Sequence, residues 1–353
     1  MIIKNLYQKQ IPMWLISMEF KKLFKLLLVM LFLSCQTKDE NKIQRIQGFA
    51  FGTSYSISYK APQLLEIDLE RQVDSIFGVI NQSLSTYIPT SDISKINQGD
   101  SLLVVDNHFV AVYHKANEIW EATGGYFDPT VGALVNAYGF GPGTPLNQIS
   151  EQQLDSILFF TGWDKTLLTE QFTIKKAHPQ VYFDFNALAK GYVVDVVADY
   201  LRIKKVFSFL VEIGGEIVAQ GKSPKSNALW SVAIDDPQQM EERDLIQVIT
   251  LNNEALATSG NYRKYSINQE TGERWVHSVN PKNGKAFPSF ILSASVLAPD
   301  CMTADAYATA LMVMPFEQSK TLISNHPQLE AYWIIADSLG GIKEVFSKGF
   351  VKQ

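Results

Sequence analysis

The order of strand-like and helix-like segments constrains the fold of this chain more than any other feature of its sequence. Segments with a two-residue apolar period or a β-rich composition predict strands, and segments with apolar residues three and four apart predict helices. The predicted strands are 47–59 with a turn at Gly52-Thr53, 181–185, 207–213, 230–234, 245–251, 292–297 and 345–350. The predicted helices are 64–84, 110–122, 187–201 and 302–311. Because strict βαβ repetition is missing, the sequence predicts a compact, mixed unit of the α+β class with one or two lobes.

Composition and short motifs exclude several classes of protein. A chain of 353 residues with 46% hydrophobic residues can bury one large core or two smaller ones. The formal net charge of −5, without a basic run beyond the N-terminal region, argues against a nucleic-acid partner. Cys35 and Cys301 lie far apart and the five histidines are scattered, so neither a zinc site nor a disulfide framework is indicated. The sequence also lacks a G-x-G-x-x-G motif after a strand and a G-x-x-x-x-G-K-S/T motif.

The N-terminal residues have the pattern of an export signal. Lys21, Lys22 and Lys25 precede the apolar stretch 26–33, which is too short to span a bilayer. The small Ser directly before Cys35 resembles a bacterial lipobox, so we expect Cys35 to carry lipid. A plain signal anchor with a chance cysteine is the alternative. The predicted organisation is a signal peptide over 1–34, a tether over 36–47 and a folded domain over 48–353.

Two oxygen donors mark the alanine-rich segment 302–311 as a candidate metal site. Alanine favours a helix, and residues four apart share a helix face, so Asp305 and Thr309 are expected to point the same way. Small neighbours let a large ligand approach, and Mg²⁺ prefers a few hard oxygen ligands together with phosphate and water. An aspartate and a threonine on a solvated helix face are the alternative.

The segment 184–195 is predicted to run from a strand end into a helix start. We expect Asp184 near the N-cap and Lys190 one to two turns into the helix, where the helix N-terminus and a lysine would attract a phosphate. Asp184 could instead accept hydrogen bonds from a heterocycle. An ordinary N-cap aspartate and a lysine whose charge reaches solvent are the structural alternative.

Several loops supply further candidates. Tyr87 precedes a short helix capped by Ser91 or Asp92, and it could either stack on an aromatic ligand or be an ordinary half-buried tyrosine. The loops 123–130 and 138–141 combine glycines with aromatic residues, which lets backbone approach a ligand, although turn chemistry also explains them.

Two polar loops follow at 257–262 and 276–284. The second contains His277 beside Ser278, and His277 is the best candidate proton acceptor among the five histidines. A structural role, which is the more common one for a lone histidine, is the alternative.

In their order and number, these motifs resemble the FAD:protein FMN transferases, the ApbE family, over roughly residues 48–320. The matching positions are Gly48, Gly52-Thr53, 85–87, Ser91, 123–130, 162–164, Asp184, Ala187, 189–192, Asp195, 213–216, 257–260, His277, Asn280-Pro281, Gly284, Ala304-Asp305 and Ala308-Thr309. Two positions depart from the usual pattern, since Phe51 replaces a methionine and Asn280 replaces an aspartate. Neither is an expected metal ligand.

The resemblance implies transfer of FMN from FAD to a threonine hydroxyl of a target protein, with Mg²⁺ as cofactor and AMP as the second product. It implies that Asp305, Thr309 and the backbone carbonyl of Ala187 bind Mg²⁺, and that His277 accepts the threonine proton. The residues expected to contact FAD are Phe51, Tyr87, Tyr126, Phe127, Asp128, Asp184, Lys190, Thr258, Ser259, Gly260, His277 and Ser278. Such a reaction depends on charge neutralisation and alignment more than on covalent catalysis, which suits a metal ion beside Lys190.

The resemblance also implies partners and a location. The acceptor is expected to be a threonine-bearing protein such as a subunit of a membrane redox complex. The chain is expected to be lipid-anchored in the bacterial cell envelope, with its domain facing the periplasm. Two other functions use similar motifs, namely a Mg²⁺-dependent FAD pyrophosphatase that yields FMN and AMP, and a non-catalytic lipoprotein that binds FAD. The last would not need a metal pair beside a histidine.

Overall fold

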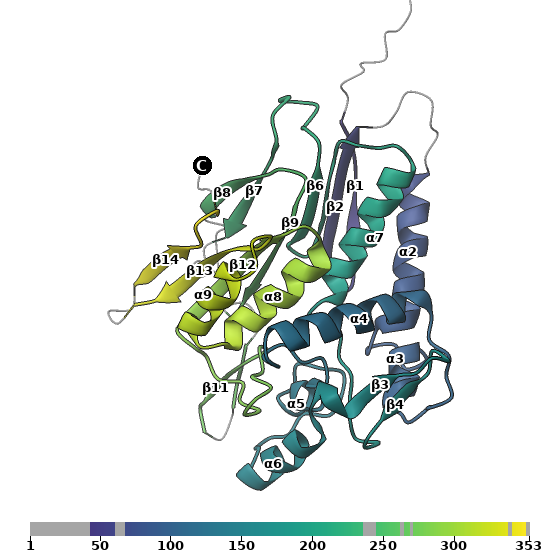
Figure 1. Ribbon diagram of the computed structural model, residues 1–353, viewed down its shortest axis with the longest axis vertical. Coiled ribbons are helices and arrows are strands. Elements are labelled where there is room, and N and C mark those ends of the chain that lie inside the picture. The colour runs from purple at the N-terminus through teal and green to yellow at the C-terminus, as the bar shows by residue number, and fades with distance from the viewer. Residues whose placement is uncertain are drawn as a thin grey trace, which may run out of the picture. The chain divides into compact units, whose positions relative to one another are not determined.

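An eight-stranded antiparallel sheet organises the described part of the chain (Figure 1). The computed structural model describes residues 43–60, 68–235, 245–261, 265–268, 271–337 and 341–350. In spatial order, the strands are β1 (Ile43–Ala50), β2 (Thr53–Lys60), β5 (Phe209–Ile213), β6 (Glu216–Gln220), β9 (Ala255–Gly260), β12 (Ile291–Ala298), β13 (Glu330–Ala336) and β14 (Ile342–Phe346). Every neighbouring pair is antiparallel, which confirms the predicted α+β class.

Three two-stranded sheets and eight α-helices complete the described elements. The small sheets pair β3 (Thr166–Leu168) with β4 (Ile174–Lys176), β7 (Trp230–Asp235) with β8 (Leu245–Leu251), and β10 (Tyr265–Ile267) with β11 (Arg274–Val276). The helices are α2 (Leu69–Leu84), α3 (Asp92–Asn97), α4 (Asn107–Ala122), α5 (Gly132–Ala137), α6 (Glu151–Phe160), α7 (Ala189–Ile203), α8 (Cys301–Val313) and α9 (Phe316–Ser324). The predicted helices and most predicted strands are therefore confirmed, with shifted ends.

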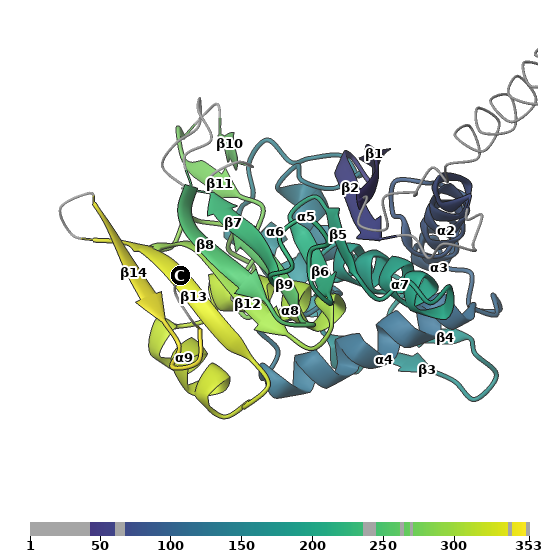
Figure 2. The same ribbon diagram turned by 90° about the horizontal axis from the view of Figure 1, so that it is seen from above.

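Helices and a hairpin cover opposite faces of the sheet. Helix α7 contacts β5 and β6, and α8 contacts β9, β12 and α7, so both helices lie along one face (Figures 1 and 2). Apolar residues of the β7–β8 hairpin pack with Ile217, Leu256 and Leu297 on the other face. The central strands are thus buried on both sides, and the two helices that carry the candidate site are fixed against them.

Three regions differ from the sequence-based expectation. The predicted strand 181–185 is wrong, because only an isolated bridge joins Tyr182 to Val131. The side chain of Asn97 instead hydrogen-bonds the N–H and the carbonyl of Phe183, so this segment has little need of a neighbouring strand. The expected polar loop at 257–262 largely forms β9, because β12 supplies the strand partners of residues 257–260 while β6 pairs with the start of β9.

The third difference concerns the tether. Strand β1 begins at Ile43 and pairs with β2 over its whole length, so residues 43–47 of the expected tether belong to the sheet. The buried side chains on β2, rather than a pattern in β1 itself, hold this pairing in place. The expected signal peptide, Cys35 and the first part of the tether lie outside the described residues. In the described ranges, the helices fall short of the length and hydropathy that crossing a membrane requires.

Helix α8 is buried on nearly all sides. Eleven of its thirteen residues are buried, and Asp300 caps its first turn by accepting a hydrogen bond from the Thr303 N–H. Asp195 of α7 accepts hydrogen bonds from the N–H groups of Cys301 and Met302, both at 2.8 Å. Four alanines keep the helix thin enough to fit between α7 and the sheet. The alternative of a solvated helix face is therefore excluded.

The close contact between α7 and α8 depends on Gly191. A Cβ atom at this position would lie 2.3 Å from the Cys301 carbonyl oxygen. Gly191→Ala is therefore expected to push α8 away and to lower the free energy of unfolding by about 1–3 kcal/mol, as overpacking typically does. Denaturant unfolding measures this change. Gly78→Ala is the matched control, because no atom lies within 4 Å of a Cβ there and alanine favours the α2 helix. Equal stability of Gly191→Ala and wild type would contradict the close contact.

Candidate active site

Asp305 lies in the second turn of α8 and is held by α7. Its side chain is almost fully buried, and its Oδ2 accepts a hydrogen bond from the Gly191 N–H at 3.0 Å. Its Oδ1 lies 3.8 Å from the Lys190 Nζ. Burial raises the pKa of Asp305, while the charge of Lys190 and the Gly191 N–H act in the opposite direction. The carboxylate is thus fixed in place with one oxygen directed toward a cation.

The Gly191 hydrogen bond also affects the carbonyl of Ala187. An N–H group near a helix start ordinarily bonds to the carbonyl four residues back, as Tyr192 does with Leu188. Gly191 donates to Asp305 instead, and within the described ranges the Ala187 carbonyl receives no backbone hydrogen bond in its place. Ala187 is half-buried in the turn before α7. Its oxygen is therefore available to a ligand next to the Asp305 helix.

Thr309 connects the candidate metal ligands to the expected FAD residues. It lies one turn after Asp305, and its Oγ1 is 3.3 Å from the Ser259 Oγ on β9. The neighbouring Thr258 hydroxyl is 2.8 Å from the Ser295 Oγ on β12. Gly260 ends β9. Because alternate residues of a strand face opposite sides of the sheet, Ser259 faces α8, whereas Thr258 shares the face of Leu256, against which the β7–β8 hairpin packs.

The half-buried Lys190 forms an ion-pair cluster with two buried carboxylates. It is the second residue of α7 rather than one to two turns into the helix, and its Nζ pairs with the Glu216 Oε1. Burial would lower the pKa of Lys190, but the charges of Asp305 and Glu216 outweigh burial and raise it. Glu216 begins β6, and burial raises its pKa against the charge of Lys190. The sequence did not single out Glu216, although it directly follows the Gly214-Gly215 turn of a matching motif.

Asp184 does not cap α7, contrary to the expectation from sequence. The N-cap position is Leu188, and the intervening residues form a turn in which the Asp184 Oδ1 accepts a hydrogen bond from the Asn186 N–H. Burial raises the pKa of Asp184. Burial also raises the pKa of Tyr87, and the charge of Asp184 adds to this effect, which means that the two side chains are close.

In the loop 123–130, some side chains are buried and stabilise the loop, and others are accessible to a ligand. Asp128 accepts hydrogen bonds from the backbone and hydroxyl of Thr130 and from the Trp163 N–H, and Phe127 is 2% exposed. These two side chains stabilise the loop itself, and their expected contact with FAD stays a prediction. Tyr126 is half-buried, with the Lys282 ammonium 5.6 Å from its ring centre. Tyr126 is therefore the ring in this loop that can meet a ligand.

Three aromatic residues expected or found near the candidate FAD positions are Tyr87, Phe140 and Phe51. Tyr87 is 58% exposed and donates a hydrogen bond from its hydroxyl to the Phe140 carbonyl at 3.2 Å. The Phe140 ring lies edge-on to His277, with 6.3 Å between ring centres. Phe51 occupies the β1–β2 turn with a φ of 52° and packs against Phe77 of α2. Phe140 therefore meets Tyr87 through its backbone carbonyl and His277 through its ring, while Phe51 is anchored on α2.

The loop after β11, which contains His277, is hydrogen-bonded to the end of α8 through Asn280. Ser278 is buried beside the half-buried His277. Asn280 accepts a hydrogen bond from the Lys282 N–H and donates one from its amide to the Val313 carbonyl at 3.4 Å. The asparagine that replaces the usual aspartate thus has a structural function, because its amide can donate to α8 where a carboxylate could not.

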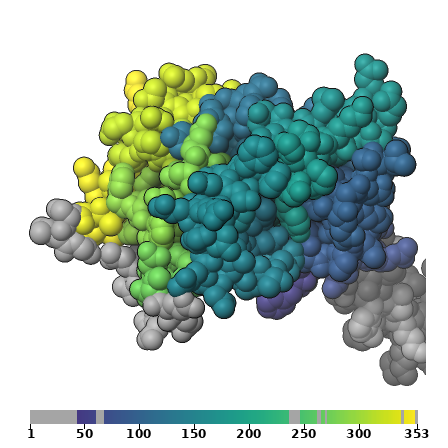
Figure 3. Space-filling view, turned by 90° about the horizontal axis from the view of Figure 1, so that it is seen from below, coloured from purple at the N-terminus to yellow at the C-terminus, as the bar shows by residue number. Residues whose placement is uncertain are grey.

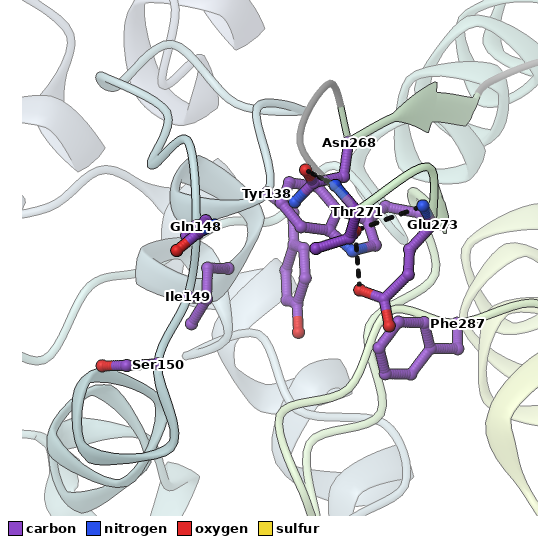
Figure 4. Close-up of a pocket in the computed structure, with 9 residues that line it drawn as sticks. Tyr138, Gln148, Ile149, Ser150, Asn268, Thr271, Glu273 and Phe287 are labelled. Atoms are coloured by element: carbon purple, nitrogen blue, oxygen red, sulfur yellow. Dashed lines mark hydrogen bonds between the residues drawn. The ribbon is translucent and has the colours of Figure 1, made fainter.

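A separate cavity of about 250 Å³ lies beside this loop. It opens between the segment containing α5 and α6 and the β10–β11 hairpin, which lie side by side on the surface in Figure 3. Its lining residues are Tyr138, Gln148, Ile149, Ser150, Asn268, Thr271, Glu273, Trp275 and Phe287. On the rim, Thr271 hydrogen-bonds both Asn268 and Glu273 (Figure 4). None of these residues belongs to the Asp305 cluster, so the cavity is not the candidate metal site.

Solved structures that share this mixed α/β fold include flavin transferases. The family model described as the ApbE family matches residues 51–333. The chain belongs to the ApbE family.

Individual relatives match over nearly the whole domain. The FAD:protein FMN transferase of Haemophilus influenzae is 35% identical over 317 residues, which cover 87% of this chain and 90% of the relative. The FAD:protein FMN transferase of Vibrio cholerae is 34% identical and covers 86% and 91%. The solved structure of the flavin transferase ApbE from Vibrio cholerae superposes with a TM-score of 0.78 at 31% identity, over 88% of this chain and 99% of that chain.

Proposed function

We propose that this chain transfers FMN from FAD to a threonine hydroxyl of an acceptor protein, that the reaction requires Mg²⁺, and that AMP is released. It is an enzyme of the transferase class, and relatives that carry this activity in their names match it over about nine tenths of their own length. The observation that carries the proposal is the position of Asp305. Its carboxylate is fixed by the Gly191 N–H beside Lys190, in reach of both a metal ion and a pyrophosphate.

The donor set fits Mg²⁺. Asp305 supplies one carboxylate, Thr309 a hydroxyl, and Ala187 a carbonyl that accepts no backbone hydrogen bond from the described residues. Across the described ranges, no group of three or more His, Cys, Asp or Glu residues could hold a metal ion, so a site rich in acids or in sulfur and imidazole is not the candidate. Mg²⁺ typically binds one or two carboxylates and completes its shell with substrate phosphate and water.

The proposed reaction assigns a separate task to each residue. The threonine oxygen attacks the phosphorus of the FMN half of FAD, the pyrophosphate P–O bond breaks, and AMP leaves with the bonding electrons. His277 accepts the hydroxyl proton, and Lys190 neutralises charge on the pyrophosphate. Tyr87 offers a ring on which the flavin can stack. Bound Mg²⁺ would supply the remaining charge neutralisation.

A product assay tests this function against the two alternatives. Purified protein is incubated with FAD, Mg²⁺ and a threonine-bearing acceptor, and the same acceptor with that threonine changed to valine serves as control. We expect covalent flavin on the first acceptor only, together with an equal amount of AMP. Free FMN without covalent flavin would identify an FAD pyrophosphatase, and unchanged FAD would identify a protein that only binds it.

The location and the acceptor class are part of the proposal. We propose a lipid-anchored protein of the bacterial cell envelope whose domain faces the periplasm, with a subunit of a membrane redox complex as acceptor. The Ser34-Cys35 junction after the apolar stretch 26–33 supports the anchor. A lipid-linked enzyme would remain close to acceptors in the same membrane.

Cys35→Ala is expected to abolish lipid attachment and leave either a soluble or an uncleaved protein. The lipidated residue supplies the thiol, and alanine cannot replace it. Intact mass and partition between membrane and soluble fractions measure the change. Cys301→Ala is the control, since this other cysteine is buried in α8 and should leave the lipid mass unaltered. Wild-type mass shift and membrane partition in Cys35→Ala would refute the anchor.

A further inference from the structure

Glu216 is a buried charge whose placement needs an explanation. Its side chain is 4% exposed at the first position of β6. The Oε1 pairs with Lys190, and the Oε2 is buried without a hydrogen-bond partner among the described residues. Burying a carboxylate is unfavourable unless its partners offset the lost hydration. With one lysine partner and one oxygen that lacks a hydrogen bond from the described residues, Glu216 is expected to add little to the stability of the fold. Its charge is therefore expected to serve the site.

Lys190 has two carboxylates within reach. It pairs closely with Glu216, whereas 3.8 Å separates its Nζ from the Asp305 Oδ1. An ammonium group and a divalent cation compete for the same carboxylate oxygen. The attraction between two opposite charges grows as they approach, so a direct contact of Lys190 with this Asp305 oxygen would oppose metal binding.

We propose that Glu216 is a positioning residue that holds Lys190 away from Asp305 and so keeps the Asp305 carboxylate open to the divalent cation. This inference rests on the proposed function, in which Asp305 is a metal ligand. With Glu216 in place, the three side chains carry a net charge of −1, which favours a cation. Without that charge, Lys190 and Asp305 neutralise each other, and the lysine ammonium occupies the oxygen that the metal needs.

In this proposal, Glu216 affects metal binding only through Lys190. A double-mutant cycle of the two residues measures this coupling. Binding of Mn²⁺, a paramagnetic substitute for Mg²⁺, is measured without FAD from the spin-resonance signal of the free ion. Glu216→Gln is expected to weaken Mn²⁺ binding by about 10- to 100-fold, the usual effect of a lost outer-shell partner. In the Lys190→Met background, the same substitution should cause little further loss, because the competing ammonium is gone. Lys190→Met alone should bind Mn²⁺ at least as tightly as wild type.

Controls separate this inference from the proposed metal site. Glu212→Gln removes the same charge from the same β5–β6 hairpin, where Glu212 accepts a hydrogen bond from the Gly215 N–H, and it should leave Mn²⁺ binding unchanged. Asp305→Asn should abolish binding in every background. If Asp305→Asn bound Mn²⁺ normally, the metal site of the proposed function would fail.

Three results would overturn the role of Glu216 but leave the proposed metal site standing, as long as Asp305→Asn still fails to bind Mn²⁺. The first is wild-type affinity in Glu216→Gln. The second is an equal loss in both backgrounds, which would mean that Glu216 acts through its own charge. The third is weaker binding in Lys190→Met, which remains informative even if Glu216→Gln does not fold. Circular dichroism and thermal unfolding establish which variants are folded.

Discussion

Asp305→Asn is expected to lose FMN transfer by roughly 10²–10³-fold or more at ordinary Mg²⁺ concentrations. A metal ion supplies several kcal/mol of charge stabilisation in the transition state, and each 1.4 kcal/mol corresponds to about tenfold in rate. Asparagine still offers an oxygen to the Gly191 N–H, which lies 3.0 Å from the Asp305 Oδ2, so the contact between α7 and α8 is preserved. Transfer of flavin and release of AMP, measured across a Mg²⁺ titration, give the size of the loss.

The burial of Asp305 determines which substitution is informative. Asp305→Ala would also leave the Gly191 N–H without a partner, at a cost of about 1–3 kcal/mol in stability, so it mixes two effects. Asp300→Asn is the matched control, because it makes the same change in the same helix and asparagine is an equally good N-cap. Turnover at the wild-type rate by Asp305→Asn, or by the wild-type protein in excess EDTA, would refute the metal site.

The sequence predicted the helix around Asp305 because its signal is local. Alanine favours the helix, and the spacing of Asp305 and Thr309 follows from helix geometry alone. The burial of this helix could not be predicted in the same way. Its composition is apolar or small on every side, so no amphipathic stripe indicates which face meets the sheet and which meets α7. That information is contained in the strands β9 and β12, far away in the sequence.

The predicted secondary structure was wrong where contacts with residues distant in the sequence, rather than the local sequence, determine the conformation. Residues 181–185 have the composition of a strand, yet the Asn97 side chain takes up the backbone groups of Phe183. Strand β9 carries the polar run Thr258-Ser259 and was therefore expected to be a loop, although two neighbouring strands make it central. In both cases, a partner more than thirty residues away decides the conformation.

The same limitation applies to the charges of the site. Lys190 was a clear candidate from its motif, but its pairing with Glu216 joins α7 to the start of β6. The sequence contained a signal in the charged residue directly after Gly214-Gly215, since a turn followed by a carboxylate at a strand start rarely serves packing. The Asp184 position was wrong for a related reason, because a turn separates it from α7. Sequence motifs thus identified which residues gather, and only the fold defined how they pair.

His277→Asn is expected to retain binding of FAD and Mg²⁺ but to lose FMN transfer by about 10²–10⁴-fold, the usual contribution of a positioned general base. The candidate metal ligands lie on α8 and in the turn before α7, and Lys190 lies on α7. His277 follows β11, so its substitution leaves those residues unchanged. Only a neutral imidazole can accept a proton. The wild-type transfer rate should therefore be lower at acidic pH, where histidine is protonated, and this pH dependence should disappear in His277→Asn.

His114→Asn provides the matched control, because His114 is exposed on α4 and is not part of the candidate site. Single-turnover transfer at several pH values, combined with separate measurements of FAD affinity, distinguishes the possible roles of His277. Transfer within a few-fold of wild type would assign the base to another group. Loss of FAD affinity without a change in the single-turnover rate at saturating FAD would make His277 a residue that holds the substrate. A pH-dependent loss of the chemical step with unchanged affinity is the result that we expect for His277, which follows β11 and has the Phe140 ring edge-on to it.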